Sequence, residues 1–356
     1  MERTLVKDLA GFEGKTVSVS GWLHKKRLLG GLTFINLRDR SGLVQIVIQD
    51  KKEVEALRGM QVGSVLKVAG SVIKEPRAPG GFEIHDPKVE ILIPVASEPL
   101  IEIDKPLSHA PANLDTLFEY RAIGLRNLSE TAIFKVQSGI LKSLREYFYA
   151  HDFTEIRTPK ILAAATEGGA EVFKFDYFGR QATLAQSPQF YKQIMVGVFE
   201  RVFEIAPVYR AEPSATTRHM TEYTSVDAEM GFINLDDLKT LLSELLNFVV
   251  DNVFDSYADE LKLLRAEKPV LTKSIPSLTM AEIHEKYSKE NGQNTVGEKD
   301  LRPDEEKWAC DYAKKNLGSE AVFVTDWPAS EMKFYHKAQA ANPELADRID
   351  LLFRGV

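Results

Sequence analysis

Short runs of alternating hydrophobic and polar residues dominate the first hundred positions. Turn signals such as Gly30-Gly31, Ser41-Gly42 and Pro79-Gly80-Gly81 separate them. The five runs are TVSVSGWLHKK, LTFINLRDR, LVQIVIQ, SVLKVAGSVIKE and FEIHDPKVEILIPV. Between the third and the fourth, KKEVEALRGM (51–60) has the pattern of a short helix. Five strands with a helix after the third predict a small Greek-key barrel of the OB type, with another small barrel or sandwich as the alternative.

The pattern changes after residue 96. Proline-punctuated residues 96–130 indicate a linker, and apolar residues at helical spacing follow. Helices are predicted over 133–152, 235–264 and 303–317, and strands over 153–162, 172–178, 201–210, 222–233, 322–328 and 349–355. Because strands and helices mix without βαβ alternation, we expect an α+β fold with an antiparallel sheet flanked by helices. The predicted organisation is a barrel domain (1–100), a hinge (101–130) and a larger domain (131–356).

Composition narrows the class of protein. The chain of 356 residues is 44% hydrophobic and 27% charged, and it has no apolar run of about 20 residues. The N-terminus lacks a signal-peptide pattern, and Cys310 is the only cysteine, so we expect a cytoplasmic protein with no membrane partner and no internal disulfide. Residues 1–100 carry 15 Lys and Arg against 12 Asp and Glu, within a total charge of −7. A mildly basic head leaves room for a local polyanion contact.

The stretch YRAEPSATTRH (209–219) concentrates charge at the end of a predicted strand. In the preceding RVFEIAPVYRAE, alternation puts Glu204, Arg210 and Glu212 on one face, with apolar residues on the other. An ion-paired, solvated hairpin is the simplest interpretation of this stretch alone. Two polar segments upstream, TEGGAE (166–171) and QSPQFYKQ (186–193), favour a built pocket instead.

Together these segments resemble the class II aminoacyl-tRNA synthetases, and most closely the aspartyl branch of archaeal and eukaryotic-like type. FKVQSGILKSLREYFYAHDFTEIRTPKIL (134–162) is similar to motif 1, whose Pro159 region forms a homodimer interface in the family. FERVFEIAPVYRAEPSATTRHMTEYTSVDAEM (199–230) is similar to motif 2. TEGGAE resembles the flipping loop, and QSPQFYKQ the strand that recognises aspartate. The resemblance implies ATP-dependent activation of L-aspartate and its transfer to tRNA(Asp), with Mg²⁺ as the metal ion.

The resemblance also implies roles for single residues. Arg210 is the catalytic residue expected to bridge the ATP α-phosphate and the aspartate carboxylate, two anions that otherwise repel each other. The remaining residues implied for the larger domain are Glu212, Arg218 and His219 for ATP, Glu171, Gln189 and Lys192 for aspartate, and Asp350 for the metal. A cation at Lys192 favours aspartate over asparagine, because a neutral amide pairs poorly with it.

GWLHKKRLLGGLTFINLRDRSGLVQIVI (21–48) resembles the anticodon-binding barrel of this branch. The resemblance implies that Phe34 stacks on a base, that Gln45 bonds a base edge, and that Arg27 contacts base or backbone. His24 and Pro79 stand where strict relatives have a tryptophan and a lysine. A histidine and a proline there are similar to the relaxed type, which also charges tRNA(Asn).

Three alternatives stay open. An asparaginyl-tRNA synthetase is disfavoured by Lys192, and the related asparagine synthetase paralogue lacks a barrel. A non-catalytic OB-type RNA-binding paralogue is disfavoured by the intact YRAE and QSPQ stretches. The family continues beyond FRGV with a metal-binding Glu, a substrate arginine and motif 3, so we expect this chain to be truncated and inactive in aminoacylation. ATP–pyrophosphate exchange at a near-normal rate would contradict that expectation.

Overall fold

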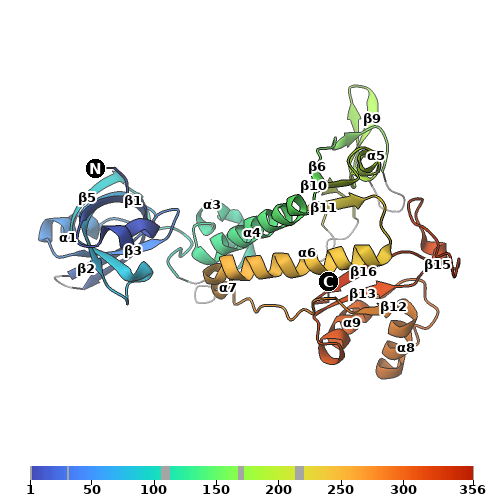
Figure 1. The fold of residues 1–356 in the computed structure, drawn as a ribbon. Helices are drawn as coiled ribbons and strands as arrows, with labels where there is room; N and C mark the ends of the chain where they lie inside the picture. The colour runs from blue at the N-terminus through green and yellow to red at the C-terminus, as the bar shows by residue number, and fades with distance from the viewer. Residues whose placement is uncertain (1, 30–31, 106–112, 167–171, 213–219, 356) are drawn as a thin grey trace. The chain divides into compact units, whose positions relative to one another are not determined.

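The computed structural model describes residues 2–29, 32–105, 113–166, 172–212 and 220–355 (Figure 1). The chain divides into two compact units. The first comprises residues 1–136 with 259–266, and the second comprises 137–258 with 267–356. A short helical segment from late in the chain therefore completes the first unit. The expectation of a separate hinge over 101–130 stays a prediction.

The first unit contains a closed barrel with the strand order β1-β2-β3-β5-β4. Strands β3 and β5 pair in parallel, and the other neighbours in the barrel are antiparallel. This confirms the predicted OB architecture. The elements are β1 (Thr16–Leu29), β2 (Leu32–Arg38), β3 (Leu43–Ile48), α1 (Lys51–Arg58), β4 (Val65–Lys74) and β5 (Phe82–Ile93).

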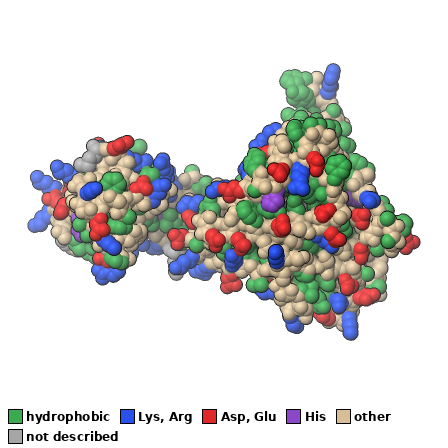
Figure 2. Space-filling model, in the orientation of Figure 1, with side chains coloured by type: hydrophobic (Ala, Val, Ile, Leu, Met, Phe, Trp, Pro, Cys, Tyr) green, Lys and Arg blue, Asp and Glu red, His purple; other side chains and the backbone are tan. Residues whose placement is uncertain are grey.

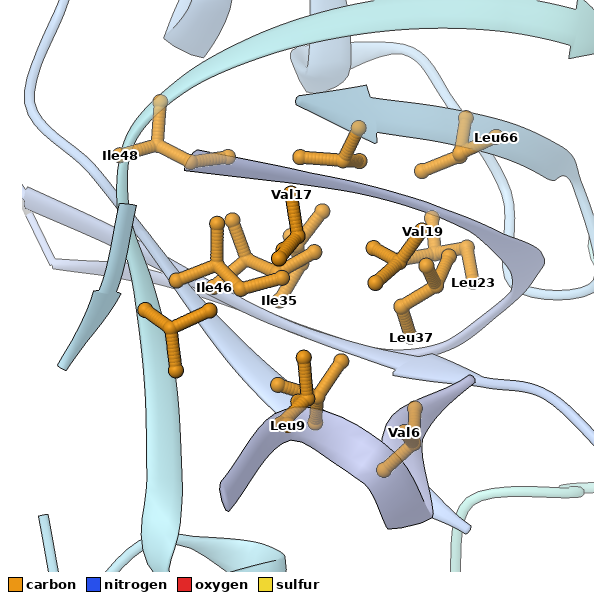
Figure 3. Close-up of a cluster of buried hydrophobic side chains, with 14 of the residues drawn as sticks. Val6, Leu9, Val17, Val19, Leu23, Ile35, Leu37, Ile46, Ile48 and Leu66 are labelled. Atoms are coloured by element: carbon orange, nitrogen blue, oxygen red, sulfur yellow. The ribbon is translucent and has the colours of Figure 1, made fainter. Parts of the chain in front are cut away.

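Alternation along these strands fills the barrel with Val, Ile and Leu (Figure 3). A 3₁₀ helix, η1 (Val6–Phe12), was not predicted; it places Val6 and Leu9 in the same apolar cluster. Helix α1 is fastened by Lys26, whose Nζ donates to the carbonyls of Leu57, Arg58 and Met60 at 3.1, 3.0 and 2.7 Å. The ammonium thus binds the C-terminal carbonyls of α1, where the helix dipole favours a cation.

After the barrel come α2 (Leu114–Glu119), α3 (Arg121–Gly124) and α4 (Leu128–Ala150), which continues into the second unit. The second unit is built on short sheets with the orders β11-β10-β6, β7-β9-β8 and β12-β13-β16, and a β14-β15 pair. Its strands are β6 (Thr154–Glu155), β7 (Ile161–Leu162), β8 (Lys174–Tyr177), β9 (Arg180–Leu184), β10 (Arg201–Tyr209), β11 (Glu222–Met230), β12 (Ser277–Thr279), β13 (Ala321–Thr325), β14 (Trp327–Pro328), β15 (Leu345–Ala346) and β16 (Asp350–Phe353). The later helices are α5 (Gln189–Phe199), α6 (Leu235–Ser256), α7 (Ala258–Leu263), α8 (Met280–Asn291) and α9 (Pro303–Asn316), with α7 in the first unit. The α+β class is confirmed.

One face of the β10–β11 hairpin forms a core against α4 and α6. Phe203 and Ile205 of β10 pack there with Ala228 and Met230 of β11, and leucines of both helices complete the cluster. Helices α4 and α6 lie side by side in Figure 1, and the hydroxyl of Tyr147 donates to the carbonyl of Leu241. The opposite face of the hairpin is therefore free to carry polar side chains.

Four predicted elements differ from the structure. The strand expected over 322–328 is divided between β13 and β14, which belong to different sheets. QSPQFYKQ was expected on a strand, but α5 begins at Gln189. The helix expected over 235–264 is two helices that meet at Tyr257. The strand expected over 153–162 is interrupted between β6 and β7, because the backbone around Pro159 bonds to a side chain of β10. In the described part of the chain, no helix combines the length and the apolar character that a bilayer crossing requires.

Candidate active site and nucleic-acid face

Alternate residues of β11 form a polar row on the free face of the hairpin. Tyr223, Ser225, Asp227 and Glu229 point to this face, since Ala228 and Met230 point to the core. The Ser225 hydroxyl donates to Asp227 Oδ2 at 2.5 Å. From Tyr223 to Glu229 the row spans about 20 Å of strand, a length suited to an extended ligand.

Lys192 of α5 meets one end of this row. Its Nζ lies 3.4 Å from Asp227 Oδ1 and 3.3 Å from Glu229 Oε2. Burial alone lowers the pKa of this ammonium, but the two carboxylates outweigh it and raise the pKa of Lys192 above 10.5. The structure thus holds a charged, mostly buried cation at the position expected to select the substrate side chain.

Arg210 meets the other end of the row. It follows β10 directly, and its backbone N–H donates to the carbonyl of Thr221 at 3.0 Å. Its guanidinium carbon lies 5.7 Å from the centre of the Tyr223 ring. Its Nε is buried and has no hydrogen-bond partner among the described residues. An aromatic platform beneath a cation fixes its direction while leaving donors for a ligand.

The other residues expected around the substrate are only partly described. Gln189 is buried as the first residue of α5, and its N–H donates to Ser187 Oγ at 3.2 Å. Glu212 is half-buried. Glu171, Arg218 and His219 lie outside the described residues, so their roles stay predictions.

Glu204 does not form the expected surface ion pair with the neighbouring strand. Its carboxylate is 2% exposed and accepts from the N–H of Thr158 at 2.8 Å, the hydroxyl of Thr158 at 2.7 Å and Lys160 Nζ at 2.9 Å. These donors flank Pro159. A buried carboxylate with three donors fixes the Pro159 segment to the strand that leads to Arg210.

Asp350, the expected metal ligand, is paired within the protein. Both carboxylate oxygens accept from Arg348, at 3.3 and 2.8 Å, and that guanidinium lies 3.8 Å over the Trp327 ring. Across the described ranges, no group of three His, Cys, Asp or Glu side chains comes together as a metal site. These residues as arranged do not fit a divalent cation, because its charge would face the Arg348 guanidinium.

Arg27, Phe34 and Gln45 share the outer face of β1, β2 and β3. Arg27 of β1 lies opposite Phe34 of β2, and Gln45 of β3 lies opposite Asn36 of β2. Arg27 is exposed, and Phe34 and Gln45 are half-buried. Gln45 Nε2 donates to Glu83 Oε1 at 2.6 Å. The three residues therefore lie on one face. They supply a cation, an aromatic ring and an amide, a combination suited to binding single-stranded RNA.

His24 and Pro79 lie away from that face. His24 is only 4% exposed, and Pro79 begins the 3₁₀ turn before β5. Burial and the nearby Arg38, opposed by Asp104 and reinforced by Lys25, lower the pKa of the His24 imidazole from 6.5 to about 4. The ring is therefore neutral near pH 7.

Comparison with protein families decides the class of this chain. A family described as tRNA synthetases class II (D, K and N) matches residues 113–356, and one described as OB-fold nucleic acid binding domain matches residues 17–92. The chain belongs to the class II tRNA synthetases. It is thus a member of an enzyme family of aminoacyl-tRNA ligases, with a barrel of the nucleic-acid-binding type.

Individual class II relatives resemble it over almost its whole length. It is 43% identical to the aspartate–tRNA(Asp/Asn) ligase of Thermus thermophilus, over 99% of this chain and 81% of that ligase. It is 39% identical to the aspartate–tRNA(Asp) ligase of Pyrococcus horikoshii, over 96% of this chain and 79% of that ligase. A solved asparaginyl-tRNA synthetase from Pyrococcus horikoshii, complexed with asparaginyl-adenylate, aligns with a TM-score of 0.88 at 27% identity, over 99% and 81% of the two chains.

Sequence reasoning missed some contacts of this synthetase. Tyr223 was not recognised as the platform under Arg210, although its period-2 spacing from Asp227 and Glu229 was visible. Glu83 was not singled out either, yet its carboxylate also lies 2.8 Å from His85 Nε2. The pairing of Glu83 with Gln45 depends on the parallel β3–β5 register, which no local pattern predicts.

Proposed function

We propose that this chain is of the aspartate–tRNA ligase type, a class that activates L-aspartate with ATP and transfers it to tRNA(Asp) and tRNA(Asn). The expectation that the chain as given is inactive stays a prediction. Family membership supports the reaction class. The identity with the Thermus thermophilus aspartate–tRNA(Asp/Asn) ligase supports the amino acid and both tRNAs.

Lys192 is the observation that carries the choice of aspartate. A mostly buried ammonium attracts the carboxylate of an aspartate side chain, and it gains less from the neutral amide of asparagine. Asp227 and Glu229 keep Lys192 charged and hold its position. The likeness to an asparaginyl-tRNA synthetase is one of overall fold. In this proposal Lys192 is the residue that favours aspartate over asparagine.

Arg210 is the residue we assign to the activation step. Forming the adenylate brings the carboxylate of the amino acid against the ATP α-phosphate, and the two negative charges repel each other. A guanidinium held over Tyr223 can donate to both groups and stabilise the charge that develops on phosphorus. Glu212 and, from the region outside the described residues, Arg218 and His219 would bind the rest of ATP, and Glu171 the ammonium of aspartate.

The barrel supplies the contact with the anticodon in this proposal. Phe34 stacks on one base, Gln45 reads a base edge, and Arg27 binds base or backbone. A homodimer through the Pro159 region and a cytoplasmic location complete the proposal. Class II synthetases use ATP with Mg²⁺, but no step is assigned to Asp350 because Arg348 holds its carboxylate.

The proposal is tested by binding of two stable adenylate analogues, aspartyl-sulfamoyl-adenosine and its asparaginyl counterpart. The unmodified chain should bind the aspartyl analogue more tightly by calorimetry. Lys192→Met should weaken that binding by about 30-fold or more, since a buried charge pair is lost. Lys239→Met, which removes only the surface pair with Asp236, is the matched control. Preference for the asparaginyl analogue would overturn the choice of aspartate.

A further inference from the structure

A β-bulge in β1 separates the RNA-facing residues of this strand from its first half. The pairing of β1 with β2 shifts between Leu23 and Lys25, so His24 is an extra residue with no partner on β2. The row of Lys25, Asn36 and Gln45 begins immediately after it. Since a bulge changes strand twist and the direction of the following side chains, the position of His24 sets how Lys25 and Arg27 face outward.

The segment that leaves the barrel lies against this bulge. Lys25 Nζ is 3.7 Å from Asp104 Oδ2. Asn127 Nδ2 donates to the carbonyls of Glu102 and Lys105 at 3.2 and 2.7 Å, which ties the same segment to the start of α4. The bulge, residues 102–105 and the residue before α4 therefore form one joint within the first unit, held by an ion pair and two hydrogen bonds.

His24 lines a small cavity at this joint. The cavity is about 60 Å³, and its lining includes His24, Asp104, Asn127, Leu128 and Leu263. His24 Nδ1 is buried and has no hydrogen-bond partner among the described residues. A buried polar atom without a partner is costly, and a cavity of this size accommodates about two water molecules.

Pro79 lines a second, larger cavity in the same region. This cavity is about 540 Å³ and shares Leu128 and Leu263 with the first. His24 and Pro79, which the family resemblance links to tRNA choice, thus both line cavities that also contact α4 and α7. Neither shares the outer face of Arg27, Phe34 and Gln45.

We propose that His24 is a positioning residue for tRNA binding, which acts through the joint with residues 102–105 and does not touch RNA. Its imidazole, bridged by water to the polar lining of the cavity, fixes the bulge and thereby the direction of Lys25 and Arg27. This inference rests on the proposed binding of tRNA by the barrel.

A double-mutant cycle tests the inference. Fluorescence anisotropy with a labelled tRNA(Asp) transcript measures the Kd of His24→Ala, Asp104→Ala and the double variant. Both side chains act through one joint, so the Kd of the double variant should not exceed that of whichever single variant binds tRNA more weakly. The Kd should be at least about threefold below the value expected if the two effects multiplied. His24→Gln, which keeps hydrogen-bonding capacity, should recover part of the affinity. Fold-changes that simply multiply would overturn the inference.

Hydrogen exchange of the free protein gives a readout that needs no RNA. His24→Ala should increase the exchange rate of the backbone amides of residues 101–105 and 127–129, and His24→Gln should increase it less. Unchanged exchange there would also contradict the positioning role. If the unmodified protein does not bind tRNA while exchange changes as expected, the proposed function fails and the joint stands. Circular dichroism confirms that each variant is folded.

Discussion

At the scale of single residues, the carboxyl group of Glu320 has a strongly lowered pKa. One oxygen lies 2.5 Å from Lys314 Nζ, and the other accepts from Arg354 and from the N–H of Val270. The hydrogen bond from Lys314 lowers the pKa of Glu320. Burial acts in the opposite direction, but with the further hydrogen bond from Arg354 the pKa falls from 4.5 to about 2. Glu320 directly precedes β13, so its carboxylate links this strand to Arg354 just after β16 and to Val270 in the chain before β12.

This predicts a pH-dependent contribution to stability. A depressed carboxyl pKa stabilises the fold above the unfolded pKa, and the contribution is lost as the pH falls from about 4.5 to about 2. Glu320→Gln should lower the free energy of unfolding by about 3 kcal/mol at pH 7. In urea titrations the difference from the unmodified chain should shrink toward zero near pH 2. Glu331→Gln, which removes only an exposed pair with Lys299, should change stability by less than about 1 kcal/mol. A difference independent of pH would contradict the assignment.

The sequence indicated candidate residues for a substrate site, but it did not indicate what those residues contact. Lys192, Arg210 and Gln189 could be chosen because a strand end carried several polar side chains. What each one contacts could not be predicted. Glu204 bonds the backbone beside Pro159, 46 positions earlier in the chain, and Arg348 holds Asp350 because Trp327 supports its guanidinium. Such pairings depend on how separate segments pack.

At the scale of elements, closure of the barrel requires glycine at two crowded positions. A Cβ on Gly21 of β1 would lie 2.2 Å from the carbonyl oxygen of Arg38, and one on Gly70 of β4 would lie 2.6 Å from that of His85. Both contacts are with backbone atoms, which cannot rotate away as a side chain can. Glycine inside a strand often marks such a close approach.

Gly21→Ala should therefore destabilise the barrel despite adding only one methyl group. We expect a loss of about 3 kcal/mol, at the upper end for overpacking, because strands β1 and β2 must separate. Gly11→Ala is the control, since nothing lies within 4 Å of the position that its Cβ would take. Thermal unfolding followed by circular dichroism should show a lowered midpoint for Gly21→Ala alone. Equal midpoints would show that the strands adjust freely.

Elements with a clear repeat were predicted well, and those shaped by tertiary contacts were not. The barrel strands and helices 133–152 and 303–317 follow simple periodicity. The expected helix 235–264 also follows it, yet it ends at Tyr257, whose ring packs against Gly139 of α4. Helix α5 was mistaken for a strand although Phe190, Ile194 and Val198 repeat every four residues. These three side chains are exposed in the structure, so the apolar repeat of α5 does not mark a helix of the core.

At the scale of the whole molecule, charge is unevenly divided between barrel and remainder. Residues 1–100 hold 15 Lys and Arg against 12 Asp and Glu within a chain of net charge −7. Figure 2 shows Lys and Arg side chains along the margin of the barrel. A modest excess of positive charge predicts that tRNA affinity depends on stacking as well as on phosphate contacts.

The two kinds of contact should separate in a salt titration. Arg27→Ala should reduce the slope of log K against log salt by about one, because a phosphate contact is lost. Phe34→Ala should weaken binding by about 1–3 kcal/mol with the slope unchanged, because stacking releases no counterions. Filter binding of tRNA(Asp) over a range of KCl concentrations measures both. A changed slope for Phe34→Ala would contradict stacking as its role.

The return of residues 259–266 to the first unit bears on the order in which the protein is made. Strands β1 to β5 emerge early from the ribosome and can close as a barrel. Lys135 of α4, however, pairs with Glu260 at 2.7 Å, and that partner is synthesised only after most of α4, the hairpin and α6. The last contacts of the first unit can therefore form only after residues 137–258 of the second unit have been translated. During synthesis, completion of the first unit therefore depends on prior translation of part of the second unit.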